Sequence, residues 1–122
     1  MKSDKAKALH CLSGQPILAW VLEALNKAQI RNVCVVIGHQ VQVVKRALSD
    51  HKVWAHQTKQ RGTADAVCSA RTWLKRQQGP VLVLAGDVPL IQPETLQALM
   101  KYHQQYRAQA TVLTMEVENP AG

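Results

Sequence analysis

An acidic residue placed directly after an apolar run is the feature of this 122-residue chain that most suggests chemistry. Residues 81–85 are continuously apolar, and Gly86 and Asp87 follow them. A carboxylate at the carboxyl end of a buried parallel strand lies where α/β sheets bind ligands. Its oxygens suit Mg²⁺, which usually takes one or two protein carboxylates together with phosphate oxygens. Gly86 lets a nucleotide approach the backbone closely. The simpler alternative is a Gly-Asp turn before a helix.

A polar stretch at residues 57–66 offers groups that suit a base and a ribose. The Gln57 side chain has both donors and an acceptor, so one amide is able to pair with the imide edge of uracil. Gly62 permits close approach, and the helix amides after Thr63 can bind polar ligand groups. The alternative is a polar connection in which Thr63 caps a helix, and taken alone this stretch favours that alternative.

Lys7 is the third candidate, within the string Lys7-Ala8-Leu9-His10. A lysine just before an apolar residue and a helix can supply a point charge for phosphate. The alternative is an ordinary solvated lysine. The five histidines lack metal-ligand spacing, and the three cysteines fit neither a zinc knuckle nor a disulfide framework. We expect these cysteines to be buried as small hydrophobic side chains.

Helix and strand patterns alternate along the chain and must position these groups. Apolar spacing predicts helices over residues 15–29, 40–49 and 64–76 and from residue 93 onward. Apolar or β-prone runs predict strands over residues 33–37, 53–57, 81–85 and 111–117. Pro16 suits the first turn of the first helix, and Pro93 opens the last. Strands separated by single helices predict one α/β domain with a mostly parallel sheet and helices on both faces.

Composition excludes several classes of protein. The chain is 47% hydrophobic, too apolar for disorder, and no apolar run reaches the roughly 18 residues that a membrane span needs. No signal-peptide pattern follows the charged N-terminus, so we expect a cytoplasmic protein without a membrane partner. The net charge of +7 comes without a basic run or aromatic residues interleaved with it, which argues against a nucleic-acid partner.

Taken together, these motifs resemble the N-acetylglucosamine-1-phosphate uridyltransferases, the N-terminal pyrophosphorylase domain of bifunctional GlmU-type proteins in the MobA-like NTP transferase superfamily. The similarity covers essentially the whole chain. The matching strings, in order, are Lys7-Ala8-Leu9-His10, Gly38-His39, Gln57, Gln60, Gly62-Thr63, Gly86-Asp87-Val88-Pro89-Leu90 and Asn119-Pro120-Ala121-Gly122.

The resemblance implies a Mg²⁺-dependent reaction in which UTP and N-acetylglucosamine-1-phosphate give UDP-N-acetylglucosamine, a cell-envelope precursor, and pyrophosphate. By resemblance Lys7 contacts phosphate, and Gln57 reads uracil. Gly62 and Thr63 line the base and ribose pocket. Ala85, Gly86 and Asp87 hold the nucleotide, with Asp87 on the metal. It also implies a Rossmann-like three-layer fold, and full-length relatives of this kind are homo-oligomers.

The chain departs from the family pattern at both ends and at two internal positions. The family opens with a strand and a glycine-rich loop, of which only Met1 remains here, and that strand lies between those at residues 33–37 and 81–85. The later sugar-binding residues, the second metal-binding residue and the acetyltransferase domain are also absent, so we expect a partial domain that is inactive alone and poorly stable. Ala64 and Asp65 replace a common Gly-His pair, and Ala85 often has a bulkier counterpart.

Other functions stay open at this stage. A non-catalytic remnant or nucleotide-binding module would keep the pocket without the transfer reaction. Another sugar-phosphate or molybdopterin nucleotidyltransferase would share the fold. A phosphoacceptor receiver domain fits the length, but it needs an acid pair after the first strand that Asp4 alone does not supply.

Overall fold

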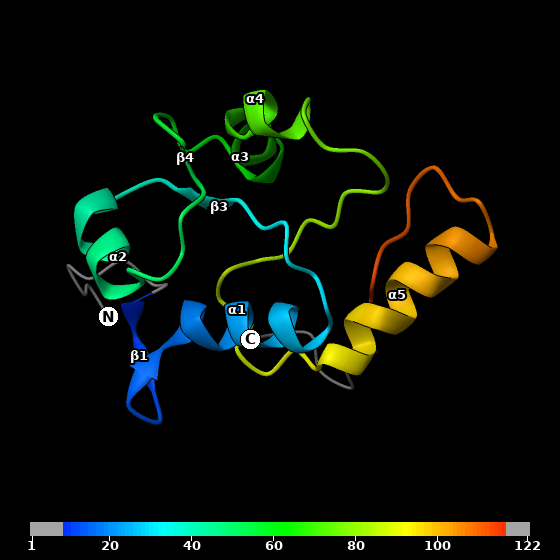
Figure 1. Cartoon of the computed structure of the whole chain (residues 1–122), viewed down its shortest axis with the longest axis horizontal. Helices are drawn as coiled ribbons and strands as arrows, with labels where there is room; N and C mark the ends of the chain where they lie inside the picture. The colour runs from blue at the N-terminus through cyan, green and yellow to red at the C-terminus, as the bar shows by residue number, and fades with distance from the viewer. Residues whose placement is uncertain (1–8, 117–122) are drawn as a thin grey trace.

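The computed structural model describes residues 9–116, and Figure 1 shows their path. The elements in chain order are β1 (Cys11–Leu12), β2 (Gln15–Pro16), α1 (Ile17–Lys27), β3 (Val35–Ile37), α2 (Val41–Ala47), β4 (Trp54–His56), α3 (Thr63–Ser69), α4 (Arg71–Leu74) and α5 (Pro93–Gln105). Lys7 and the string at residues 119–122 lie outside the described residues, as does the last residue of the strand predicted at 111–117.

The core forms around α1, whose apolar residues recur at helical spacing on one face. Leu18, Val21 and Leu25 are buried there, as the sequence pattern predicts. α5 contacts α1, and its Leu96 is only 1% exposed within the same apolar cluster. Pro93 occupies the start of α5, as predicted, because its fixed φ suits the first turn and its missing N–H is not needed there.

A short hairpin precedes α1, where the sequence pattern predicts helix. β1 and β2 pair antiparallel around Ser13 and Gly14, which both have positive φ, 51° and 85°. This is the backbone that two-residue hairpin turns require. The helix predicted from residue 15 therefore begins at Ile17, and Pro16 is its N-cap residue.

β3 and β4 form the parallel pair that the alternating pattern predicts. Their register places Val35 opposite Trp54 and Ile37 opposite His56. The Gln57 N–H extends the ladder by donating to the Ile37 carbonyl at 2.9 Å. Because the strands are parallel, their carboxyl ends lie at the same edge, and Gln57 begins the loop at that edge.

The predicted sheet is only partly present. Residues 81–85 and 111–116 have no strand assignment, and within residues 9–116 the strands form two separate two-stranded sheets. A strand is defined by its pairing, and β3 pairs with β4 alone in this part of the chain. Val83 and Val112, expected in strands, are 52% and 79% exposed. These two strand predictions were therefore wrong for the described residues.

Two further local predictions were wrong. The helix predicted over residues 64–76 is divided into α3 and α4 at Ala70, and its N-cap residue is Gly62, with Thr63 the first helical residue. Cys11 and Cys68 are exposed and Cys34 is partly buried, so these cysteines are not the buried small residues we expected.

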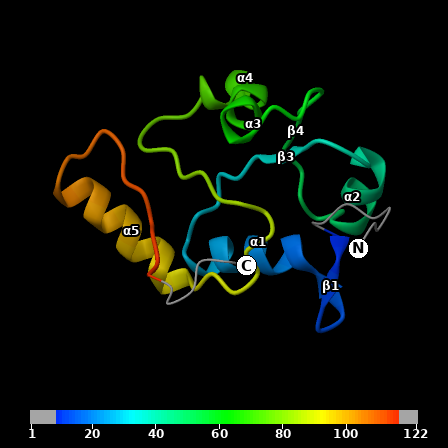
Figure 2. The same cartoon turned by 180° about the vertical axis from the view of Figure 1, so that it is seen from behind.

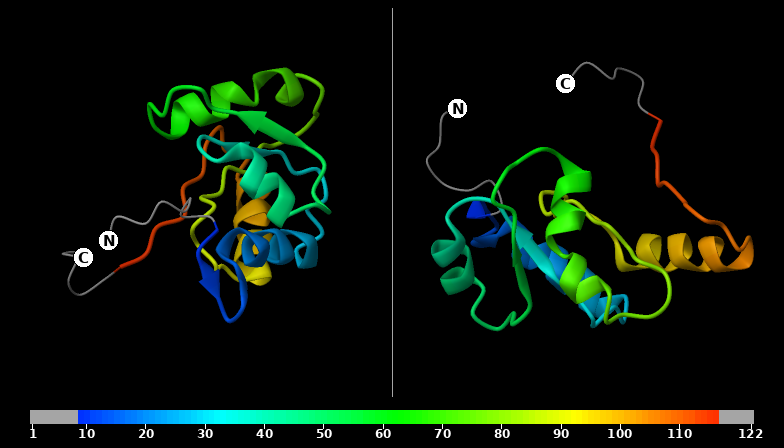
Figure 3. Two further views of the ribbon diagram at one scale, coloured as in Figure 1. Left: turned by 90° about the vertical axis from the view of Figure 1, so that its left-hand side faces the viewer. Right: turned by 90° about the horizontal axis from the view of Figure 1, so that it is seen from above.

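Helices lie on both sides of β3. Figures 1 and 2 show α1 on one side of this strand and the α3–α4 pair on the other. The side view in Figure 3 agrees, and it places the strand between the two groups of helices. The segment 81–86 passes between α1 and the α3–α4 pair (Figures 1 and 2). Across residues 9–116, each helix is too short or too polar to cross a membrane.

Candidate functional site

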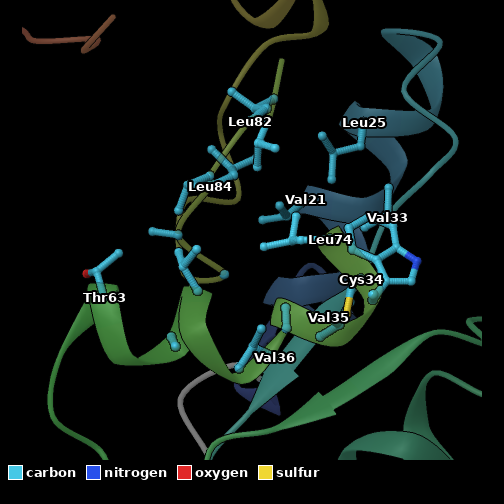
Figure 4. Close-up of a pocket in the computed structure, with 18 of the residues that line it drawn as sticks. Val21, Leu25, Val33, Cys34, Val35, Val36, Thr63, Leu74, Leu82 and Leu84 are labelled. Carbon is cyan, nitrogen blue, oxygen red and sulfur yellow. The ribbon is translucent and has the colours of Figure 1, made fainter. Parts of the chain in front are cut away.

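A cleft of about 550 Å³ lies between β3 and the 81–86 segment. α1 contributes Leu18, Val21, Leu22 and Leu25 to its lining, while α3 and α4 contribute Ala66, Val67, Trp73 and Leu74. Figure 4 shows Leu82 and Leu84 on one side of it, Val21 and Leu25 on α1, and residues 33–36 near Leu74. Most of the lining is aliphatic.

The end of the cleft at which β4 finishes carries Gln57, Gln60 and Thr63, and we call it the polar end, although Asn32 before β3 also lines the cleft. Five of the predicted site residues line the cleft: Gln57, Gly62, Thr63, Ala85 and Gly86. The parallel β3–β4 pair places Gln57 at this end, and the 81–86 segment passes beside it without forming a strand. Their role toward a ligand stays a prediction.

Gln57 is held firmly in this loop. Only 9% of its surface is exposed. Its side-chain Nε2 donates to the Gly62 carbonyl at 3.2 Å and to Asp65 Oδ2 at 2.9 Å. Asp65 lies in the first turn of α3, where a negative charge is favourable. The sequence pattern indicated Gln57, but it gave no sign that Asp65 binds it, since residues eight apart share no local periodicity.

Two glycines of the site have different surroundings. Gly62 has a φ of +102°, a conformation that side chains other than glycine rarely adopt, so the backbone itself requires glycine there. A Cβ at Gly86 would meet Leu18 at 3.5 Å, an ordinary contact. The packing of the described residues therefore does not demand glycine at position 86.

Gln60 also lines the cleft, although the sequence reasoning gave it no site role. Its side chain lies across Gly38, just after β3, and a Cβ at Gly38 would collide with its amide. Gly38 thus allows Gln60 to lie over the end of β3. Its place in the Gly38, Gln57, Gln60 order of the family pattern was the available signal.

Asp87 lies in a turn directly after Gly86, is exposed, and is not among the cleft-lining residues. Residues 9–116 contain no cluster of three or more acidic, His or Cys side chains able to hold a metal ion. One exposed carboxylate still fits Mg²⁺ that arrives with a nucleotide, because phosphates and waters fill most of its coordination sphere. It does not fit an ion held by protein groups alone.

The chain matches the MobA-like NTP transferase domain over residues 1–120. The chain belongs to this family. Similar curated relatives are the bifunctional protein GlmU of Acetivibrio thermocellus, 39% identical over 122 residues, and that of Geobacter metallireducens, 43% identical over 124. The GlmU of Listeria innocua is 38% identical over 122 residues. All of this chain is covered in each case.

The resemblance to the N-terminal domain of GlmU-type proteins is thereby confirmed. The chain spans about a quarter of the length of these relatives, 26% of the first two. Membership in the MobA-like NTP transferase family supports nucleotidyl transfer as the general activity. The particular nucleotide and sugar are matters for the proposal that follows.

Proposed function

We propose that this MobA-like domain binds UTP with Mg²⁺ and takes part in transferring its uridylyl group to N-acetylglucosamine-1-phosphate. The product would be UDP-N-acetylglucosamine, used for cell-envelope synthesis. The observation that carries the proposal is that residues from two segments far apart in the sequence, Gln57 with Gly62 and Thr63, and Ala85 with Gly86, line one cleft. GlmU-named relatives at 38–43% identity support the choice of sugar nucleotide.

In this proposal each group meets the part of UTP that suits its chemistry. Gln57 is buried and carries an amide, so it meets the base. The backbone at Gly62 and Thr63 meets the ribose, and the backbone at Ala85 and Gly86 admits the nucleotide closely. Asp87, exposed beside them, holds Mg²⁺. Lys7, outside the described residues, supplies a point charge for phosphate.

The transfer needs no protein nucleophile, because the sugar phosphate itself attacks UTP. An oxygen of the sugar phosphate forms a bond to the α-phosphorus of UTP, and the bond from that phosphorus to the bridging oxygen breaks. The electron pair leaves with pyrophosphate. Bound Mg²⁺ supplies Lewis-acid stabilisation and a template for the phosphates. The protein's own part is to position the nucleotide and keep the base in a partly dry cleft.

Titration with Mg–UTP tests the nucleotide site, and Trp73 in the cleft lining provides a fluorescence signal. We expect saturable binding that Gln57→Ala weakens by about tenfold, as loss of one buried hydrogen-bonding group does. Gln104→Ala, an exposed glutamine on α5, is the matched control and should bind as the unchanged chain does. Absence of saturable binding at millimolar Mg–UTP would contradict the proposal.

A second function, nucleotide binding without transfer, is favoured by one observation: Asp87 does not line the cleft that holds the other predicted residues. Pyrophosphate release separates the two. Release from Mg–UTP that depends on N-acetylglucosamine-1-phosphate supports transfer. Binding of Mg–UTP with no release supports the binding module.

A further inference from the structure

The Gln57 amide nitrogen is fully engaged by the protein itself. Nε2 carries two hydrogens, and it donates to two oxygens, the Gly62 carbonyl at 3.2 Å and Asp65 Oδ2 at 2.9 Å. The side chain is nearly buried, so these bonds are sheltered from competing water. No donor of this amide remains for a ligand.

The orientation of the amide follows from the chemistry of its two partners. A backbone carbonyl and a carboxylate only accept hydrogen bonds. Turning the amide over would place Oε1 against both oxygens, which repel it, and would leave Nε2 of the nearly buried Gln57 side chain without these acceptors. Oε1 is therefore the atom of this side chain that is left to meet a ligand.

Of the two partners of Nε2, only Asp65 contributes a side chain, so only this contact can be removed by a substitution. Its bond to Nε2 is charge-assisted and the shorter of the two, whereas Gly62 contributes a backbone group that every residue possesses. α3 holds Asp65 in place, and the Ser69 hydroxyl donates to the Asp65 backbone carbonyl at 2.9 Å. A side chain unable to accept at position 65 would release one Gln57 N–H.

We infer that Asp65 is a positioning residue that makes Gln57 a pure acceptor and thereby selects the base; this inference rests on the proposed function. An acceptor suits a ring nitrogen that carries hydrogen, as N3 of uracil does. Placed opposite ring position N3, it opposes cytosine, whose N3 carries no hydrogen and is itself an acceptor, whereas placed opposite the 4-amino group of cytosine it would not discriminate. The sequence suggested that the amide pairs with the whole imide edge of uracil. In this inference only Oε1 meets that edge, at N3–H, because both amide hydrogens are already bonded within the protein.

Hydrogen exchange of the Gln57 side-chain amide, followed by NMR on the ¹⁵N-labelled full chain, tests the contact without any nucleotide. We expect both amide protons to exchange slowly in the unchanged chain and one to exchange faster in Asp65→Ala. Asp65→Asn keeps an acceptor oxygen and should restore slow exchange. Glu94→Ala is the matched control, since Glu94 is also acidic in a first helical turn but belongs to α5.

The ratio of Mg–UTP to Mg–CTP affinity tests base choice in the same four proteins. We expect the unchanged chain to favour UTP and Asp65→Ala to reduce that preference by about tenfold, because a freed N–H allows the amide to offer a donor to cytosine. Asp65→Asn and Glu94→Ala should keep the preference. A ratio unchanged in Asp65→Ala, with the amide proton released, overturns the inference and leaves the proposed function standing.

The remaining outcomes also decide the matter. Exchange that Asp65→Ala does not alter shows that Asp65 does not hold the amide, and the inference fails. If the unchanged chain binds neither nucleotide, the proposed function fails, and the role in base choice fails with it. The exchange data then show only whether Asp65 serves the loop structurally.

Discussion

Gln57 and Asp87 lie in contrasting environments, and the contrast matches different parts of a nucleotide. The Gln57 amide is nearly buried and hydrogen-bonded, so it can discriminate by hydrogen bonding in a site with little water. The Asp87 carboxylate is exposed, where a hydrated cation and its phosphates can reach it. At the scale of single residues, the proposed site thus offers a nearly buried amide for the base and an exposed carboxylate for the phosphates and their cation.

Cys34, a partly buried residue of the cleft lining, provides a pH-dependent prediction at this scale. Burial raises the pKa of its thiol because desolvation disfavours the thiolate. Since the thiolate is the reactive form, we expect iodoacetamide to modify Cys34 more slowly than the exposed Cys11 and Cys68 near pH 8. Mass spectrometry of peptides from the folded chain gives the three rates, and equal rates for Cys34 and Cys68 would contradict this.

The same pKa shift fixes the sign of the effect on stability. The folded chain holds the Cys34 proton to higher pH than the unfolded chain, whose thiol pKa is about 8.5. The free energy of unfolding is therefore undiminished by this group below that value. It decreases as the pH rises from there toward the raised pKa of the folded state.

The sequence identified candidate residues that line the cleft, but it did not identify their hydrogen-bond partners. Gln57, Gly62 and Gly86 were identifiable because their chemistry and their positions at predicted element ends suit a ligand. The bond from Gln57 to Asp65 depends on how the loop folds back onto α3, and no sequence spacing reports it. The pairing of Gln57 with the imide edge of uracil stays a prediction.

At the scale of elements, helices were easier to predict than strands. The apolar period of α1 and the proline that opens α5 act locally, so both helices were expected. The 81–85 segment is β-prone, but strand formation also needs a partner, which the described residues do not supply. The β1–β2 hairpin had a local signal, the Ser13-Gly14 dipeptide, that the helix pattern obscured.

Leu96 provides the test at this scale, because it joins α5 to the apolar cluster around α1. Leu96→Ala should destabilise the chain by about 2–5 kcal/mol, through lost burial and a cavity. Urea unfolding followed by circular dichroism measures this change. Leu90→Ala removes the same atoms from a side chain that is 76% exposed and should cost much less. Equal losses in the two variants would mean that α5 does not dock as the structure shows.

At the scale of the whole molecule, the cleft is lined by three groups of elements. α1 lies on one side and α3 with α4 on the other, while β3 and the 81–85 segment form the remaining walls. Aliphatic side chains line most of it, and the polar groups gather at one end. The sequence predicted most of the helices, and the MobA-like family match supports nucleotidyl transfer as the general activity.

The proposed function requires that a uridine nucleotide bind at the polar end of this cleft. Amide chemical shifts of the ¹⁵N-labelled full chain, recorded as Mg–UTP is added, locate the bound nucleotide. We expect the largest saturable shifts on Gln57, Gly62, Thr63, Ala85 and Gly86. Largest shifts on α5 or on the β1–β2 hairpin, or none at millimolar Mg–UTP, would contradict it.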